Sequence, residues 1–310
     1  MITETFTYKS YDNENIFTYK WYAESTQFRG IVHITHGLSE HAGRYSYFAS
    51  KLTSRGYIVY AHDQRGHGKT AKNADNLVHI NEGGWYAMQK DIIQLTDYIK
   101  NTHPNLPLFL FGHSMGSFLL RNILQDSRPN VKGIILSGTG CFEGLALNAG
   151  ILISKARAKR NGPHKRSFYI NYITFKAFNS NVSNPKTFFD WLSRDDNVIE
   201  KLYHDPLYRT NCSNNLFLEL FNGLKTIQNP TTIKKVPKNI PVFFVSGDND
   251  PVGHWGKDVL ELAKLYKDIG VKNVQYKLYP GARHEIINEI NKDEVIKDIT
   301  DWLNNNAYQL

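Results

Sequence analysis

The sequence predicts an α/β fold with a mostly parallel central sheet, helices on both faces and a helical insertion. Short apolar runs alternate with stretches of helical periodicity, which is the pattern of a parallel sheet covered on both faces. The alternation stops near residue 139 and resumes near residue 238, so one segment interrupts it. A length of 310 residues, with 41% hydrophobic and 21% charged residues, fits one globular domain with an insertion.

The first two strands are expected to form a hairpin. Thr5–Lys9 and Ile16–Tyr22 are rich in β-branched and aromatic residues, and Asp12–Asn15 supplies turn-forming side chains between them. Further strands are expected at the apolar runs 30–37, 57–63, 107–114, 131–138, 241–250 and 274–281. Helices are expected between or after them at 45–55, 85–102, 115–125, 257–268 and 293–304. This order predicts a doubly wound sheet, whose ligands gather at the carboxyl ends of the strands.

The interrupting segment is expected to be a helical cap over the sheet and not an independent domain. The chain then divides into a first part of the core, the cap and a second part of the core, at 1–139, 140–237 and 238–310. Within the cap, Asn184 followed by Pro185 is typical of a helix start, which predicts a helix continuing over Phe188–Leu192. Thirteen aromatic residues fall in the segment, so we expect the cap to line an apolar cavity.

The positive charge of the chain is concentrated in the cap. The formal net charge is +8, and eight of the 37 basic residues lie between Gly144 and Phe189, a stretch without Asp or Glu. The other 29 basic residues equal the 29 acidic residues in number. The basic segment 155–166 lies between apolar runs, which is typical of peripheral contact with an anionic membrane and argues against a nucleic-acid partner. A solvated basic helix face explains the pattern equally well, so both interpretations stay open.

Three features of the sequence bear on the cellular compartment of the protein. There is no run of about 18 apolar residues that would span a membrane, and the polar N-terminus lacks the apolar region of a signal peptide. Cys141 and Cys212 are too few for a disulfide framework and are expected to be reduced thiols. We therefore expect a cytoplasmic protein, with or without peripheral membrane contact. The sequence gives no indication of the oligomeric state.

A nucleophile motif follows one of the predicted strands. Gly112-His113-Ser114-Met115-Gly116 matches G-x-S-x-G, in which a serine occupies a sharp strand-to-helix turn. The motif alone is common by chance, but here it directly follows the apolar run 107–111 and opens a predicted helix. Ser114 is therefore predicted to be a catalytic nucleophile, and a serine nucleophile needs a base and an acid.

The base and the acid are expected in loops after the later strands. His284 follows the last predicted strand and completes the chain order Ser, Asp, His, whereas His254 comes shortly after the acid and is expected to be a surface or capping residue. Two carboxylates, Asp248 and Asp250, follow the run 241–247. Asp250 precedes Pro251, which favours an extended or turn conformation, but spacing by itself does not decide between the two carboxylates.

Acyl transfer also needs two donors for the oxyanion of the tetrahedral intermediate. The backbone N–H of Met115, directly after the serine, is expected to be one donor. The backbone N–H of Leu38, in the loop after the run 30–37, is expected to be the other. The chemistry needs no cofactor and no metal ion, and the sequence contains no H-E-x-x-H metal motif.

Five motifs in the same order resemble those of one family. The segments 36–45, 63–68, 112–116, 246–252 and 281–285 resemble the motifs of monoacylglycerol lipases and bacterial lysophospholipases, and Phe189–Asp195 looks like the bacterial members. The resemblance implies an α/β-hydrolase fold, and it implies Asp250 as the acid of a triad with Ser114 and His284. Some relatives carry a second histidine three residues after the catalytic one, where this chain has Ile287.

These observations predict a serine carboxylester hydrolase that acts on single-chain lipids such as monoacylglycerols or lysophospholipids. Other activities of the same triad stay open, namely a different esterase, a thioesterase, a peptidase or an acyltransferase. A non-catalytic ligand-binding protein on the same scaffold is the alternative from another class. An epoxide hydrolase or dehalogenase of this fold would need an aspartate where Ser114 stands.

Overall fold

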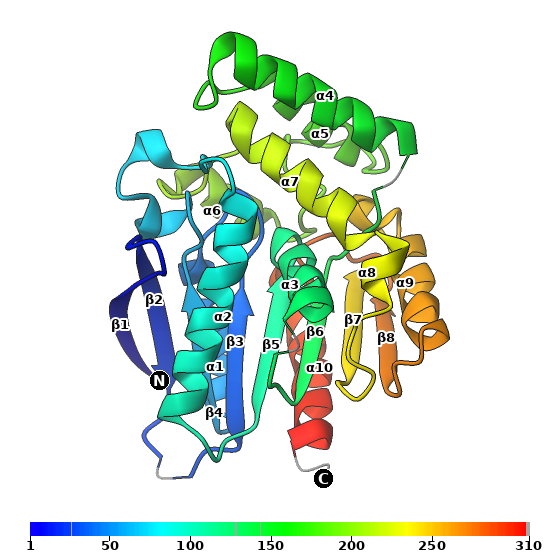
Figure 1. Ribbon diagram of the computed structural model, residues 1–310. Coiled ribbons are helices and arrows are strands. Elements are labelled where there is room, and N and C mark those ends of the chain that lie inside the picture. Colours follow the sequence, from blue (N-terminus) through cyan, green and yellow to red (C-terminus); the bar gives the residue numbers. More distant parts are fainter. Residues whose placement is uncertain (26, 128, 143, 308–310) are drawn as a thin grey trace.

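The computed structural model describes residues 1–25, 27–127, 129–142 and 144–307. A single sheet of eight strands has the order β1-β2-β4-β3-β5-β6-β7-β8 (Figure 1). The strands are β1 (Ile2–Lys9), β2 (Asn15–Tyr22), β3 (Gly30–Thr35), β4 (Tyr57–His62), β5 (Leu108–His113), β6 (Gly133–Ser137), β7 (Val242–Gly247) and β8 (Val274–Tyr279). Each predicted strand is present, which confirms the predicted α/β class.

The predicted hairpin is the antiparallel edge of this sheet. β1 pairs with β2 from Ile2 opposite Tyr22 to Lys9 opposite Asn15, and β2 pairs antiparallel with β4. The other neighbouring strands pair in parallel. β3 to β7 are buried along their whole length, as expected for strands covered on both faces.

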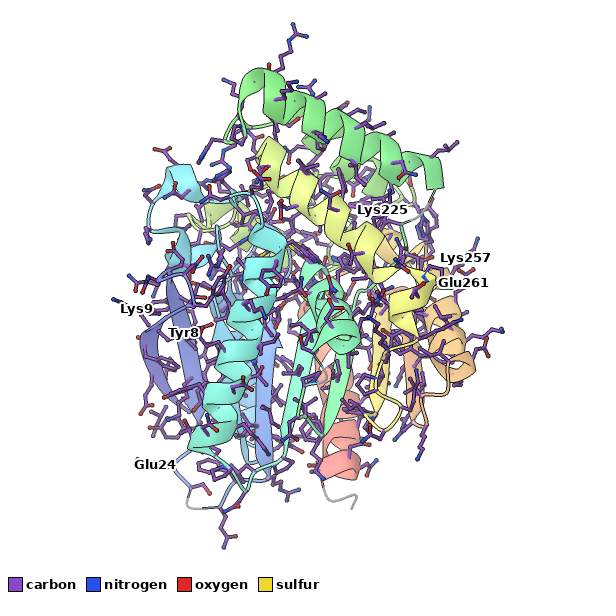
Figure 2. The ribbon with its side chains drawn as sticks, viewed as in Figure 1. Tyr8, Lys9, Glu24, Lys225, Lys257 and Glu261 are labelled. Carbon is purple, nitrogen blue, oxygen red and sulfur yellow. The ribbon has the colours of Figure 1, made fainter. Side chains whose placement is uncertain are left out.

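Helices of the core cover the two faces of the sheet (Figure 1). One face is covered by α1 (Ser46–Thr53) and α10 (Lys292–Ala307), which share one hydrophobic cluster. The other face is covered by α2 (Gly84–Thr102), α3 (Met115–Asp126) and α9 (Lys257–Asp268). Exposed charged side chains such as Lys9, Glu24, Lys257 and Glu261 lie at the periphery, as Figure 2 shows.

Residues 140–237, which we call the insert, connect β6 to β7. They contain α4 (Gly144–Asn161), α5 (Phe168–Phe178), α6 (Asp196–His204), α7 (Asn214–Ile227) and α8 (Pro230–Ile233). In Figure 1 the helices α4, α5 and α7 lie above the carboxyl ends of the parallel strands. Among the described residues of the insert there is no strand, so its predicted helical character is confirmed.

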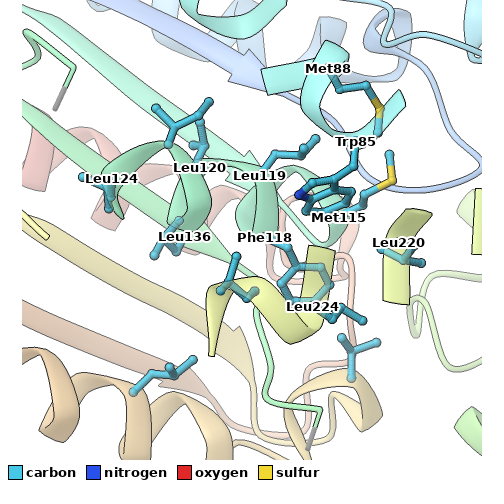
Figure 3. Packing of buried hydrophobic residues seen from close by; sticks show 14 of the residues in the cluster. Trp85, Met88, Met115, Phe118, Leu119, Leu120, Leu124, Leu136, Leu220 and Leu224 are labelled. Atoms are coloured by element: carbon cyan, nitrogen blue, oxygen red, sulfur yellow. The ribbon is translucent and has the colours of Figure 1, made fainter. Parts of the chain in front are cut away.

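Helix α7 joins the insert to the core. Figure 3 shows Leu220 and Leu224 of α7 beside Met115 and Phe118 of α3, and all four belong to the largest hydrophobic cluster. A Cβ atom on Gly223 of α7 would lie 2.2 Å from the indole of Trp85, so glycine is needed for this close approach. None of the described helices is long and apolar enough to cross a membrane.

The helix predicted over Phe188–Leu192 is wrong. This stretch forms turns, and Asn184 has φ +51°, a left-handed conformation instead of the extended one of a helix N-cap. A helix would pair the N–H of Trp191 with the carbonyl of Thr187, but the side chain of Asn179 takes both groups. Its amide nitrogen donates to the Thr187 carbonyl at 2.9 Å and its oxygen accepts from Trp191 N at 2.9 Å.

Candidate active site

Ser114 occupies the tight turn between β5 and α3. Its backbone has φ +50° and ψ −120°, a conformation that non-glycine residues seldom adopt and that projects the side chain at the strand end. A Cβ atom on Gly112 would lie 2.7 Å from the Gly116 carbonyl, and one on Gly116 would lie 2.1 Å from the Thr35 carbonyl. The two glycines of the motif are therefore required by close backbone packing around the serine.

The structure brings His284 against Asp250. The Nδ1 atom of His284 lies 2.9 Å from each carboxylate oxygen of Asp250, and the two side chains are 3% and 0% exposed. Asp250 also accepts hydrogen bonds from Ser246 Oγ at 3.0 Å and Val252 N at 2.9 Å. A carboxylate in this position orients the imidazole and fixes its tautomer, leaving Nε2 to act on a neighbouring group.

The pair perturbs the pKa of both groups. Burial by itself would raise the pKa of Asp250, but the His284 imidazole and the hydrogen bonds to the carboxylate hold it below its ordinary value. Burial by itself would lower the pKa of His284, but Asp250, with smaller contributions from Glu285 and Glu40, raises it above its ordinary value. Each partner thus stabilises the charged form of the other.

The two alternative candidates from the sequence, Asp248 and His254, have other partners. Asp248 accepts a hydrogen bond from Gly281 N at 2.7 Å, so it ties together the loops after β7 and β8. His254 pairs through Nδ1 with Asp258 Oδ2 at 2.8 Å, and its side chain is half exposed. Neither residue has the contacts of the His284–Asp250 pair.

The proposed oxyanion donors Leu38 and Met115 line the same cavity as Ser114 and His284. A Cβ atom on Gly37 would lie only 3.2 Å from the Cβ of Ser114, so the loop that holds Leu38 passes directly beside the serine. Met115 is the first residue of α3, where backbone N–H groups lack partners within the helix. Both backbone N–H groups therefore lie in segments of the chain that are adjacent to Ser114.

A buried ion network, which sequence reasoning missed, surrounds these loops. Glu40 accepts from Gly37 N at 2.6 Å and binds Arg44 at 2.8 Å. Arg44 also binds both carboxylate oxygens of Glu285, at 2.8 and 2.6 Å, and Glu285 is the residue after His284. Although burial raises the pKa of Glu285, Arg44 holds that pKa well below its ordinary value. The network therefore ties the loop of Leu38 to the loop of His284, and its members lay in the motifs at 36–45 and 281–285.

The cavity at Ser114 is mostly apolar and has a volume of about 290 Å³. Most of the polar lining residues come from the core, among them Ser114, His284 and Glu285. The insert contributes mainly apolar side chains, among them Leu147, Phe175, Phe178, Trp191, Leu192, Phe217, Leu220, Phe221 and Leu224. Such a cavity fits an apolar group whose polar end reaches the serine. Within the described residues, no group of three or more His, Cys, Asp or Glu side chains could hold a metal ion.

Comparison with known proteins agrees with this geometry. A family model described as serine aminopeptidase, S33, matches residues 26–291. A monoacylglycerol lipase from Mycolicibacterium smegmatis is 27% identical over 92% of this chain and 91% of its own length. The phospholipase YtpA from Bacillus subtilis is 26% identical over 86% of this chain and 92% of its own length.

A solved structure agrees as well. A thermostable carboxyl esterase from Bacillus coagulans, in complex with glycerol, has a TM-score of 0.91 and 28% identity, covering 99% of both chains. The likeness confirms that the fold is that of the α/β-hydrolases.

Proposed function

The chain belongs to the serine aminopeptidase S33 family, and from this premise we propose that it hydrolyses carboxylic esters of single-chain lipids, monoacylglycerols or lysophospholipids, through Ser114, His284 and Asp250. The observation that carries the proposal is the His284–Asp250 pair at the polar end of an apolar cavity lined by Ser114. The monoacylglycerol lipase and phospholipase among the relatives support a lipid ester as the substrate.

In the proposed mechanism the triad transfers an acyl group to water. His284 Nε2 takes the proton of Ser114 Oγ as that oxygen bonds to the ester carbonyl carbon. The N–H groups of Leu38 and Met115 donate to the oxyanion that forms. The bond to the alcohol breaks, the alcohol leaves with the proton held by His284, and an acyl-enzyme remains. Water then attacks with His284 as base, and release of the acid restores the Ser114 hydroxyl.

The proposal is tested by rates against monoacylglycerols and lysophospholipids of acyl lengths from two to eighteen carbons, with a matched series of p-nitrophenyl esters. We expect kcat/KM to rise with acyl length as the chain fills the cavity, and the ratio between the two lipid classes identifies the head group. A preference for acetyl esters, peptides or thioesters would contradict the lipid assignment. Formation of a new ester when an alcohol is added would identify an acyltransferase.

We also propose that the chain divides into a first part of the core (1–139), the insert (140–237) and a second part of the core (238–310), and that the insert caps the core as a lid. We further propose that the outer surface of the insert contacts membranes peripherally. The apolar side chains Leu145, Leu152 and Phe168 are 89%, 67% and 75% exposed on α4 and α5. Exposed basic residues lie along the same part of the chain, at Lys155, Lys159, Arg160 and Lys165. Apolar and basic groups together are typical of a surface that binds anionic lipid.

Sedimentation with vesicles tests this contact. We expect binding to vesicles that contain phosphatidylglycerol and weaker binding to pure phosphatidylcholine. Replacing Lys155, Lys159 and Arg160 with Glu is expected to weaken binding to the anionic vesicles by at least roughly 100-fold, because each basic group contributes about 1 kcal/mol. The matched control carries the same charge change at the exposed residues Lys9, Lys235 and Lys257. Equal binding by both triple variants would support the solvated-face interpretation instead.

A further inference from the structure

One short segment of the insert is bound to the loop that carries His284. We call residues 190–195 the anchored segment. His284 N donates to the Trp191 carbonyl at 3.3 Å, and Glu285 N donates to the Leu192 carbonyl at 2.7 Å. Arg283 Nη1 donates to the carbonyls of Asp190 at 2.6 Å and Ser193 at 3.0 Å. The backbone on both sides of His284 is therefore held by the insert.

An ion pair with a buried carboxylate holds the end of the same segment. Arg194 binds Glu289 through its backbone N at 3.1 Å and through Nε at 2.9 Å, and the Glu289 side chain is fully buried. Ser193 Oγ donates to the Asn288 carbonyl at 3.0 Å. Two charge-assisted hydrogen bonds to a buried carboxylate give this attachment a fixed geometry.

Within the anchored segment, Trp191 packs against the His284 ring. The two ring centroids lie 5.1 Å apart with an interplanar angle of 36°. His113, the residue before Ser114, lies near the same imidazole, at 4.7 Å. Burial lowers the pKa of His113 to about 3, so this neighbour is a neutral ring at physiological pH. The orientation of the imidazole is therefore limited by an aromatic ring from the insert and one from the core.

The indole is itself held in place. Trp191 is 5% exposed, and its backbone N–H donates to Asn179 Oδ1 at 2.9 Å, whereas its indole nitrogen is buried without a hydrogen-bond partner among the described residues. Its ring centroid lies 4.7 Å from that of Phe178 and 6.2 Å from that of Phe175, both in α5. A side chain restrained from the backbone and from two rings is a rigid surface for the imidazole.

We propose that Trp191 is a positioning residue: the insert supplies its indole to hold the His284 imidazole between Asp250 and Ser114. The inference rests on the proposed triad. A rigid neighbouring side chain contributes to the rate because it keeps a reacting group within a fraction of an ångström of its productive position. A misplacement of about 1 Å can lower the rate roughly 100-fold. The insert then has two roles: it encloses the acyl group, and it supplies the residue that positions His284.

The test compares Trp191→Leu with Trp191→Phe and with Trp302→Leu. Trp302 lies in α10 and is matched to Trp191, because it is 4% exposed and its indole nitrogen is likewise buried without a hydrogen-bond partner in the described structure. Its ring packs on Phe243 in the core, 5.6 Å between centroids. Hydrolysis of p-nitrophenyl acetate is measured, since an acetyl group does not need the acyl cavity. The low-field proton resonance of the His284 Nδ1–H is recorded alongside.

We expect Trp191→Leu to lower kcat by roughly 30- to 100-fold with KM within twofold of wild type. Its low-field resonance is expected to broaden through exchange with water. Trp191→Phe retains an aromatic ring beside His284, so its kcat is expected to stay within threefold of wild type and its low-field resonance to remain sharp. Trp302→Leu is expected to lose stability but to keep the kcat and the resonance. Wild-type kcat and resonance in Trp191→Leu would overturn the proposal, as would equal losses of kcat in the two Leu variants.

A second variant covers the case in which Trp191→Leu does not fold. Arg283→Met keeps the indole and removes the two hydrogen bonds that the Arg283 guanidinium donates to the anchored segment, so we expect a fall in kcat of at least threefold with KM unchanged. An unchanged kcat in that case would overturn the inference. Ser114→Ala separates this result from the proposed function, because activity that survives in Ser114→Ala contradicts the triad itself, whatever the Trp191 variants do.

Discussion

Two parts of the insert differ in how they meet the core. The anchored segment 190–195 exchanges backbone and ionic hydrogen bonds with the loop of His284, through Arg283 and Arg194 among others. Helix α4 packs mainly against α7 of the same insert, and its buried residues are only Leu147 and Ser154. An insert can therefore be rigid where it touches catalytic groups and loosely attached where it meets solvent.

The physical reason for the difference lies in what each part buries. The anchored segment covers the fully buried carboxylate of Glu289, which would be costly to leave unpaired, so the geometry of this attachment is tightly specified. Helix α4 leaves apolar and basic side chains exposed, and little free energy is lost if it shifts. The expected consequence is that substitutions of the same kind act very differently in the two parts.

The largest effect is expected at Asp250, the partner of the histidine that the anchored segment holds. Asp250→Asn keeps the shape of the side chain but removes the charge and the acceptor that set the tautomer of His284, so kcat is expected to fall by roughly 10⁴. Steady-state rates on p-nitrophenyl acetate measure it. The matched control Asp248→Asn removes a loop contact two residues away and is expected to stay within tenfold of wild type. Equal losses in both variants would show that the loop, and not the His284–Asp250 pair, matters.

The next largest effect is expected on the free energy of unfolding, when the ion network of Glu40, Arg44 and Glu285 is disrupted. Arg44→Met leaves Glu40 and Glu285 buried without their cation, and the free energy of unfolding at pH 7 is expected to fall by about 3–5 kcal/mol. Urea denaturation measures it. The loss should shrink as pH is lowered toward about 4, because protonation removes the unpaired charges. Arg55→Met is the control, since its pair with Asp301 spans 4.0 Å and both groups are exposed, and it should change stability by less than about 0.5 kcal/mol.

A direct comparison of the two parts uses one substitution in each. Arg194→Met removes a partner of the fully buried Glu289 and is expected to lower the free energy of unfolding by about 1–3 kcal/mol. Arg160→Met, at the exposed end of α4, is expected to change it by less than about 0.5 kcal/mol. The same denaturation curves measure both. Equal effects of the two variants would remove the distinction between an anchored and a loosely attached part.

The smallest expected effect is a shift along the pH axis. His284 must be neutral to act as a base, and its pKa is raised, so kcat/KM should rise with pH through a midpoint above the ordinary histidine value of about 6.5. In the residual activity of Asp250→Asn the midpoint should move below about 6.5, because the burial that lowers the pKa remains and the carboxylate charge is gone. A midpoint that does not move would mean that another group controls the rate.

The sequence predicted the core of the molecule well because its signals are local. Apolar runs and helical periodicity located the strands and core helices to within a few residues, and the glycines around Ser114 follow from close packing within the turn itself. The site depended more on long-range placement. Asp248 and Asp250 share one loop, and their spacing did not decide which of them meets His284, 34 residues further along the chain; the family resemblance implied Asp250, and the fold pairs that residue with His284.

The insert was the part that the sequence predicted least. The helix expected over Phe188–Leu192 is absent because the side chain of Asn179 occupies the backbone groups that would begin it. Likewise, the contact of Trp191 with His284 joins the middle of the insert to a loop of the core 93 residues further along the chain, and no local pattern encodes it. The stretch 189–195 stood out only through its resemblance to bacterial relatives.

The central claim, that Ser114 is a nucleophile activated by His284, is tested most directly by reaction with a fluorophosphonate. Mass spectrometry of the intact protein and of its peptides measures how many groups are added and where. We predict one phosphonyl group per chain, located on Ser114, with hydrolysis lost in proportion to labelling and labelling abolished in His284→Ala. A label on another residue, or full hydrolytic activity in protein labelled completely at Ser114, would contradict the claim.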